Sequence, residues 1–242
     1  MGEPFFDRYK DNGQILDNTW RARPNIYESR LRLLHRALTT REPGKILSIG
    51  IGSGIFETLL RERYGIEVAE AVEPSASLGA TAREKGLNVV ESTAQDCDYA
   101  GAPYDTIVYN GASFGFIPDD EIESTFAHNR EVLADNGRLI LTDVPAESTL
   151  GIILKLAQRY DIAREDIDDL LVGTSFFNLD THAYKPNWHP IPWYADLLIR
   201  IGYRDLQFFQ TVLANPPYQN DQVEDPIKGY TQGNYVAIVA SK

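Results

Sequence analysis

Three glycines and one carboxylate carry the clearest chemical signal in this sequence. Gly50, Gly52 and Gly54 follow a short apolar run, and Glu73 ends the next apolar run along the chain. Glycines after a buried strand let the backbone turn sharply and let a ligand come close to it. A carboxylate at the end of the neighbouring strand can accept hydrogen bonds from two ribose hydroxyls. This spacing predicts a site for a nucleoside-bearing cofactor, with group transfer or hydride transfer as the chemistry.

The elements that must position these residues follow from the alternation of apolar runs and helical patterns. That alternation predicts a parallel sheet with helices on both faces. Two late strands, separated by a loop rich in Pro, Asn, Asp and Gly, are expected to form an antiparallel hairpin at one edge. The fold class is therefore α/β, a Rossmann-like doubly wound sheet of seven strands. The expected strands are 45–49, 67–73, 87–90, 104–109, 138–142, 206–213 and 234–240, and the expected helices are 3–18, 26–38, 54–64, 75–85, 119–134, 148–161 and 191–201.

The glycine spacing separates two classes of cofactor-binding protein. The dinucleotide fingerprint is G-x-G-x-x-G, whereas this chain has G-x-G-x-G. That pattern resembles motif I of the class I S-adenosylmethionine-dependent methyltransferases, and the resemblance covers residues 45–145 and 190–240. The family has an acid two places before the first glycine, where it helps to hold the ammonium group of methionine. Ser48 stands there in this chain, which weakens the correspondence at that position and leaves the contact to another residue.

The resemblance implies a set of cofactor-binding residues in four segments. Glu73-Pro74-Ser75 is similar to the family's acid followed by a helix start. Ala94, Gln95 and Asp96 are similar to the segment that meets the adenine, although a simple Asx-type turn is the alternative there. Residues 104–109 resemble the family's (F/Y)-D-x-(I/V)-(I/V) strand, after which the chain runs beside the methionine part of the cofactor. The full set is Ser48, Gly50, Gly52, Gly54, Glu73, Pro74, Ser75, Ala94, Gln95, Asp96, Asn110, Gly111 and Ala112.

The acceptor side is expected in an irregular segment after the fifth strand and in the N-terminal helices. Residues 176–194 hold two of the four histidines and two of the three tryptophans. In the family an insertion at this point forms one wall of the acceptor pocket. His182, Tyr184 and His189 are therefore candidates for a general base or a substrate hydrogen bond, unless they only pack an ordered loop. Candidates for substrate contacts are Tyr9, Trp20, Phe114 and Trp188.

Composition and charge limit the partners. The formal net charge is −12, which disfavours nucleic acid, and no dense basic run offsets it. The tetrapeptide 215–218, Asn-Pro-Pro-Tyr, matches the catalytic motif of adenine-N6 methyltransferases, but it follows the wrong strand and is interpreted as a loop. The arginines of the N-terminal region are expected on a solvated helix face; they are Arg21, Arg23, Arg30, Arg32 and Arg36.

Other signals bear on location and metals. The single cysteine, Cys97, excludes an internal disulfide, and no run is apolar and long enough to span a membrane. Neither a secretory signal nor metal-ligand spacing is present, so we expect a cytoplasmic protein without a metal.

These observations favour one domain, 1–242, and one activity. We expect an N-terminal helical lid at 1–41, a cofactor-binding half at 45–145, a substrate-side insertion at 146–190, and a C-terminal helix and hairpin at 191–242. The resemblance implies methyl transfer from S-adenosylmethionine to a small-molecule N, O or S acceptor in a closed pocket, with S-adenosylhomocysteine as product and a monomer or homodimer as assembly. The alternatives are an NAD-dependent oxidoreductase and a non-catalytic nucleoside-binding protein of the same fold.

Overall fold

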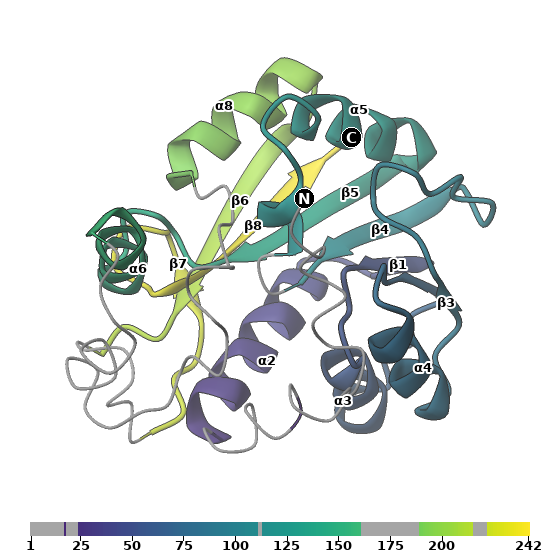
Figure 1. Cartoon of the computed structure of the whole chain (residues 1–242), viewed down its shortest axis with the longest axis horizontal. Coiled ribbons are helices and arrows are strands. Elements are labelled where there is room, and N and C mark those ends of the chain that lie inside the picture. The colour runs from purple at the N-terminus through teal and green to yellow at the C-terminus, as the bar shows by residue number, and fades with distance from the viewer. Residues whose placement is uncertain (1–16, 18–23, 111–112, 161–188, 215–221) are drawn as a thin grey trace.

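The computed structural model describes residue 17 and residues 24–110, 113–160, 189–214 and 222–242. Their strands form one eight-stranded sheet with the order β3-β2-β1-β4-β5-β8-β6-β7 (Figure 1). The strands are β1 (Ile46–Ile49), β2 (Glu70–Val72), β3 (Val89–Val90), β4 (Tyr104–Tyr109), β5 (Leu133–Asp143), β6 (Arg204–Thr211), β7 (Ile227–Lys228) and β8 (Tyr235–Ser241).

The predicted α/β fold, mostly parallel with antiparallel C-terminal strands, is confirmed. Strands β1 to β5 pair in parallel, whereas β8 is antiparallel to both β5 and β6. The sheet has one strand more than the expected seven, because β7 adds a two-residue pairing at the edge, inside the expected loop. The chain builds outward from β1 to β3 and then crosses to β4 on the other side of β1. This reversal between β1 and β4 is the point at which open α/β sheets bind ligands.

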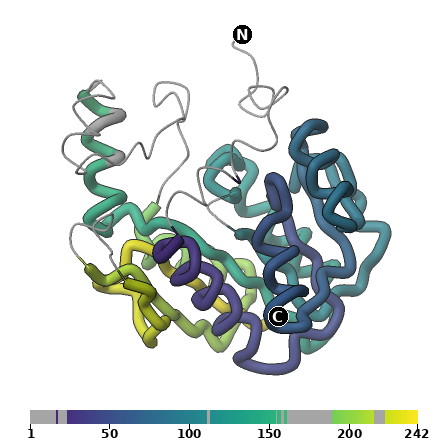
Figure 2. The backbone as a smooth tube through the Cα atoms, turned by 90° about the horizontal axis from the view of Figure 1, so that it is seen from below, coloured from purple at the N-terminus to yellow at the C-terminus, as the bar shows by residue number. Residues whose placement is uncertain are grey.

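Helices cover both faces of the sheet because the strands are apolar on both sides. Ile46 of β1 packs in one core cluster, and Leu47 and Ile49 pack in another on the opposite face. Figure 1 shows α2, α3 and α4 on one face, with α5 and α8 on the other, and Figure 2 looks onto the face that α2 covers. The helices are α2 (Pro24–Leu38), α3 (Ile55–Tyr64), α4 (Ala76–Glu84), α5 (Ile122–Val132), α6 (Thr149–Tyr160) and α8 (Ile191–Ile201), with a short 3-10 helix, η2 (Ser113–Phe116).

Strand β5 is longer than predicted. It begins at Leu133, inside the helix expected over 119–134, whereas the sequence predicted a strand only from residue 138. Leu133 already pairs with Tyr104, and the register then shifts so that Arg138 pairs with Thr106. The Asp-Asn-Gly sequence therefore forms an irregularity within the strand, because pairing with β4 resumes on both sides of it.

Helix α2 lies along the sheet with a fixed direction. Near its end, the buried guanidinium of Arg138 on β5 donates hydrogen bonds to the Leu38 carbonyl and to Thr40 Oγ1. The start of α2 consequently lies toward the carboxyl edge of the sheet. Arg30 was expected on a solvated face, but it is only 6% exposed, and its guanidinium lies over the rings of Phe56 and Tyr235. That expectation is wrong for Arg30 because α2 packs between α3 and the C-terminal strands.

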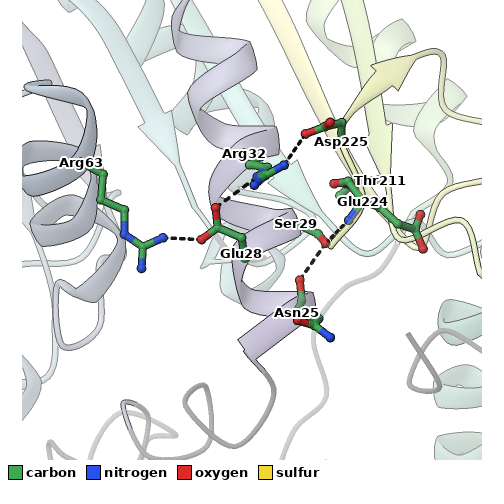
Figure 3. Close-up of polar contacts among 8 residues, drawn as sticks. All are labelled: Asn25, Glu28, Ser29, Arg32, Arg63, Thr211, Glu224 and Asp225. Atoms are coloured by element: carbon green, nitrogen blue, oxygen red, sulfur yellow. Dashed lines mark hydrogen bonds and ion pairs between the residues drawn. The ribbon is translucent and has the colours of Figure 1, made fainter. Parts of the chain in front are cut away.

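A buried hydroxyl joins the start of α2 to the C-terminal strands (Figure 3). Ser29 Oγ donates to the Asn25 carbonyl at 2.7 Å and accepts the backbone N–H of Glu224 at 2.9 Å. The Glu224 carbonyl in turn accepts from Thr211 Oγ1 on β6 at 3.1 Å. These contacts hold the first turns of α2 against the loop between β6 and β8.

An ion-pair chain makes a second link from α2 to its neighbours (Figure 3). Arg32 pairs with Asp225 at 2.7 Å and with Glu28 at 3.1 Å, and Glu28 also pairs with Arg63 of α3. Most of these side chains are partly exposed, so each pair adds little stability by itself. The chain mainly fixes the position of α2 between α3 and the C-terminal loop.

Replacing the buried hydroxyl should destabilise the protein. Ser29→Ala removes the acceptor of the Glu224 N–H in a site that water does not reach, which should lower the free energy of unfolding by about 1–3 kcal/mol. Urea unfolding measures this change. Ser124→Ala is the matched control, because Ser124 makes a similar hydroxyl-to-carbonyl bond on α5 while exposed. Equal effects of the two substitutions would contradict a specific role for the buried contact.

Candidate active site

The turn after β1 is one that only glycines permit. Gly50 and Gly54 have φ values of 70° and 72°. A Cβ on Gly50 would lie 2.2 Å from the Ser113 side chain, and a Cβ on Gly54 would lie 2.3 Å from that of Leu87. Both the backbone conformation and the packing therefore exclude a side chain. The turn places its backbone N–H groups at the carboxyl edge of the sheet, at the reversal between β1 and β4.

Glu73 connects this turn to the neighbouring strand. One oxygen of its carboxylate accepts the Gly52 N–H at 2.7 Å, and the other accepts the Ser75 N–H at 2.9 Å. Burial raises the pKa of Glu73, while the two N–H groups act against that rise. A carboxylate has about four acceptor positions, so two remain for other donors. The sequence predicted Gly52, Glu73 and Ser75 as one site, and the structure brings them together next to Pro74.

Ser75 starts the helix that follows. Its side chain accepts the Leu78 N–H, which caps α4 as the sequence predicted. The helix can begin immediately after β2 because of this cap, and Glu73 is thereby held at the end of its strand.

Ser48 has a buried acidic partner that the sequence reasoning missed. Ser48 Oγ donates to Glu57 Oε1 at 2.8 Å, and among the described residues Glu57 Oε2 has no hydrogen-bond partner. Burial raises the pKa of Glu57 to about 7, and the charge of Glu73 adds to the rise. The sequence signal for Glu57 was its position three places after Gly54. An acid at that position is usually interpreted as part of a helix cap. Glu57 makes no cap and instead turns toward β1.

One residue of the expected N-terminal lid reaches the glycine turn. Asp17 accepts a hydrogen bond from the Ser53 hydroxyl, and its other oxygen pairs with Lys85 Nζ at 2.6 Å. Lys85 Nζ also donates to the Ser53 carbonyl at 2.9 Å. Asp17 is 4% exposed, so this small network is enclosed. The lid candidates Tyr9 and Trp20 lie outside the described residues.

The segment after β3 forms a compact turn on the predicted adenine side. Asp96 accepts from Thr93 Oγ1 at 2.8 Å, and its own N–H donates back to that hydroxyl at 3.2 Å. Gln95 donates to Glu121 at 3.0 Å, and Ala94 is buried. These bonds close a local turn through the Thr93 hydroxyl and not through an Asx side chain. Contacts of these residues with adenine stay a prediction.

The ends of β4 and β5 meet beside the turn. Thr142 Oγ1 donates to Asn110 Oδ1 at 3.0 Å, which joins the residue after β4 to the last but one residue of β5. One place further, Asp143 is 3% exposed, and burial raises its pKa to about 8. Sequence reasoning gave Asp143 no role in the site, because it was noted only as the end of the fifth strand. Gly111 and Ala112, predicted beside Asn110, lie outside the described residues.

Of the acceptor-side candidates, Phe114 and His189 are described. Phe114 is 1% exposed and packs edge-on against Tyr194 of α8, with ring centroids 5.1 Å apart. His189 Nε2 lies 2.8 Å from Asp119, and its ring stacks on Trp193 at 3.7 Å. Both are held by packing at the edge of α8. His182, Tyr184 and Trp188 lie outside the described residues, as does the loop 215–218.

Other chemistry finds no support in the described parts of the chain. There, no three His, Cys, Asp or Glu side chains gather into a group that could hold a metal ion. Cys97 is buried, and burial raises the pKa of its thiol, which makes it a poor nucleophile. No described helix is both long enough and apolar enough to cross a membrane.

Comparisons with known proteins identify one family and one fold. The methyltransferase domain family matches residues 19–190 of the chain. A SAM-dependent methyltransferase from Thermotoga maritima, described as a possible histamine N-methyltransferase, aligns with a TM-score of 0.77 and 20% identity, over 99% of this chain and 100% of that one. A SAM-dependent methyltransferase from Archaeoglobus fulgidus has a TM-score of 0.63 and 16% identity, over 96% and 100%. The plantazolicin methyltransferase BpumL, solved with SAH, has a TM-score of 0.59 and 11% identity, over 98% and 94%. No curated protein matches the chain significantly.

The buried Glu57 carboxyl should make the stability of the unliganded protein depend on pH. Its pKa in the folded protein, about 7, lies above the ordinary value of 4.5, so the folded state holds this proton more tightly than the unfolded state. The resulting loss of stability is absent below about pH 4.5, grows as the pH rises, and is complete above about pH 7. Glu57→Gln carries no such loss, so its melting temperature should exceed that of the wild type by several degrees at pH 8 and match it near pH 4.5.

Thermal unfolding across this pH range measures the effect. Glu62→Gln is the control, because Glu62 is an exposed acid on the same helix. A difference between Glu57→Gln and wild type that does not change with pH would contradict the buried-acid assignment.

Proposed function

This chain belongs to the methyltransferase domain family, and we propose that it transfers a methyl group from S-adenosylmethionine to a small-molecule N, O or S acceptor. The observation that carries the proposal is the Glu73 carboxylate, which is held at the glycine turn by Gly52 and Ser75 and keeps two acceptor positions for a ribose. The neighbour BpumL was solved with SAH, which supports the same donor in this site.

The donor is already activated, so the protein needs mainly to orient it. Methyl transfer from a sulfonium is a direct displacement in which the bond from the acceptor atom to carbon forms as the sulfur–carbon bond breaks. S-Adenosylhomocysteine leaves with the electron pair. Alignment of the three atoms and exclusion of water supply most of the catalysis. In this proposal Glu73 fixes the ribose, the glycine turn approaches the methionine part, and Asp17 helps to enclose the site.

Glu57 is our candidate for the contact with the ammonium group of methionine. Ser48 cannot supply a negative charge for this contact, because its side chain is a neutral hydroxyl. Its carboxyl lies 2.8 Å from Ser48 Oγ, so the acid comes from helix α3 instead of strand β1. An ammonium group nearby would stabilise the charged form of this buried acid. This arrangement would supply a carboxyl group at that point of the fold although Ser48 is not an acid.

Two variants should distinguish the contact with the ribose of the donor from the contact with its ammonium group. Glu73→Ala should weaken both S-adenosylhomocysteine and 5′-methylthioadenosine by about 1.5–3 kcal/mol, because both ligands carry the ribose. Glu57→Gln should weaken only S-adenosylhomocysteine, by about tenfold, which corresponds to roughly 1.4 kcal/mol, because 5′-methylthioadenosine has no ammonium group. Calorimetric titration measures both ligands.

Controls make this result specific. Glu84→Gln removes an exposed acid from α4 and should change neither affinity. The double variant Ser48→Asp, Glu57→Gln returns the acid to β1 and should recover affinity for S-adenosylhomocysteine. Unchanged binding in Glu73→Ala would remove that residue from the ribose role. Equal losses of both ligands in Glu57→Gln would remove Glu57 from the ammonium role.

A further inference from the structure

Asp143 is a buried carboxyl group to which the proposed binding of the donor assigns no role. It is the last residue of β5, and one oxygen accepts the Val144 N–H at 2.6 Å. The other oxygen is buried and has no hydrogen-bond partner among the residues that the structure describes. An unsatisfied buried carboxyl oxygen is costly, so its presence calls for a ligand or a structural reason.

The carboxyl lies at the edge of the sheet where the methyl group would be presented. Its neighbour Thr142 is hydrogen-bonded to Asn110, the residue predicted beside the methionine part of the donor. The charge of Arg30 on α2 lowers the pKa of Asp143, and the charge of Asp143 raises the pKa of Tyr194 on α8. These two helices cover opposite faces of the sheet (Figure 1). Asp143 is the last residue of β5 and pairs with Val236 of β8, so its carboxyl lies at the carboxyl edge of the sheet.

Charges of both signs act on Asp143. Arg30 lowers the pKa of Asp143, and Glu147, in the turn before α6, acts more weakly in the opposite direction. Asp119 and Glu147 also raise the pKa of Tyr194, and His189 pairs with Asp119. The Arg30 guanidinium lies over the rings of Phe56 and Tyr235, so it is shared with other groups. The Asp143 carboxylate itself is therefore the group that would attract a ligand with a positive charge.

We propose that Asp143 binds the acceptor nitrogen of an aliphatic amine substrate and takes a proton from it before methyl transfer. This assignment rests on the proposed function and narrows its acceptor to one class. An ammonium group entering the site would pair with the Asp143 carboxylate, which compensates two charges that are costly to bury alone. The unpartnered oxygen is the atom that would accept the N–H.

The chemistry balances without another reactant. The ammonium gives one proton to the carboxylate, leaving a neutral amine and a carboxylic acid. The amine lone pair then attacks the methyl carbon, the carbon–nitrogen bond forms, and the sulfur leaves with the electron pair of the broken bond. The product is a methylated ammonium ion, and the Asp143 proton returns to solvent.

An amine suits this acid better than an alcohol does. Burial raises the pKa of Asp143 to about 8, within a few units of an alkylammonium. Proton transfer between groups of similar pKa is efficient, whereas an alcohol would hold its proton far too tightly. A thiol reaches its reactive form without a base of this kind, so neither alternative explains the buried acid.

The test compares one scaffold with three nucleophiles. Benzylamine, benzyl alcohol and benzyl mercaptan, and the corresponding n-butyl and 2-phenylethyl compounds, are incubated with the full chain and S-adenosylmethionine, and release of S-adenosylhomocysteine is measured. We expect at least one amine to be methylated, and its alcohol and thiol counterparts to react more than tenfold more slowly. Asp143→Asn should lower amine turnover at pH 7 by about a hundredfold. That deficit should shrink at pH 9.5, where solution already supplies the neutral amine.

Separate readouts distinguish the possible failures. Asp135→Asn makes the same change of charge at the exposed far end of β5 and should behave as wild type. S-Adenosylhomocysteine affinity should stay within about twofold in Asp143→Asn, and Asp143→Ser serves as a second variant if that one does not fold. Turnover by no amine, preference for alcohols or thiols, or a deficit that does not change with pH would each overturn the assignment to Asp143 while donor binding stands. Absence of S-adenosylhomocysteine binding by wild type would overturn the proposed function as well.

Discussion

The hydrogen bond from the Gly52 N–H to Glu73 is the contact on which the site depends. It joins the turn after β1 to the end of β2, and the turn exists only because its glycines adopt left-handed backbone conformations. The parallel pairing of β1 with β2 and β4 brings the ends of these strands to one edge. Without this contact the carboxylate and the glycine turn would be neighbours but would not form a fixed cradle for a ligand. Helix α2 then closes one side, held by Ser29 and Arg138 at its two ends.

Buried acid is the second property of this edge. Glu57, Glu73 and Asp143 lie on three different elements, and burial raises the pKa of each. Such groups reduce the stability of an empty protein at neutral pH, because the folded state disfavours their charged forms. In our proposals a cationic donor would favour the charged form of Glu57, and an ammonium acceptor would favour that of Asp143. The same buried acids therefore lower the stability of the empty protein and raise its affinity for positively charged ligands. This relation is common at functional sites.

Sequence patterns predicted the features that local chemistry determines. The glycine turn, Glu73 and the Ser75 cap each depend on residues close together in the chain, so their spacing was enough to find them. Glu57 was missed and Asp143 was given no role because their significance comes from packing. Glu57 turns toward Ser48 on β1, and Asp143 is placed at the edge by the pairing of β5 with β8. Arg30 was misplaced for the same reason, since its burial depends on the C-terminal strands. The short strand β7 and the early start of β5 likewise depend on pairing partners distant in sequence.

The most direct test of this account is calorimetric titration of the unmodified protein with S-adenosylhomocysteine and, separately, with NADH. The account predicts binding of S-adenosylhomocysteine at roughly micromolar affinity, about −8 kcal/mol, and no heat from NADH. Binding of NADH alone would indicate the site of an oxidoreductase. Absence of binding heat with both ligands would mean that the site formed by Glu73 and the glycine turn does not hold a nucleoside.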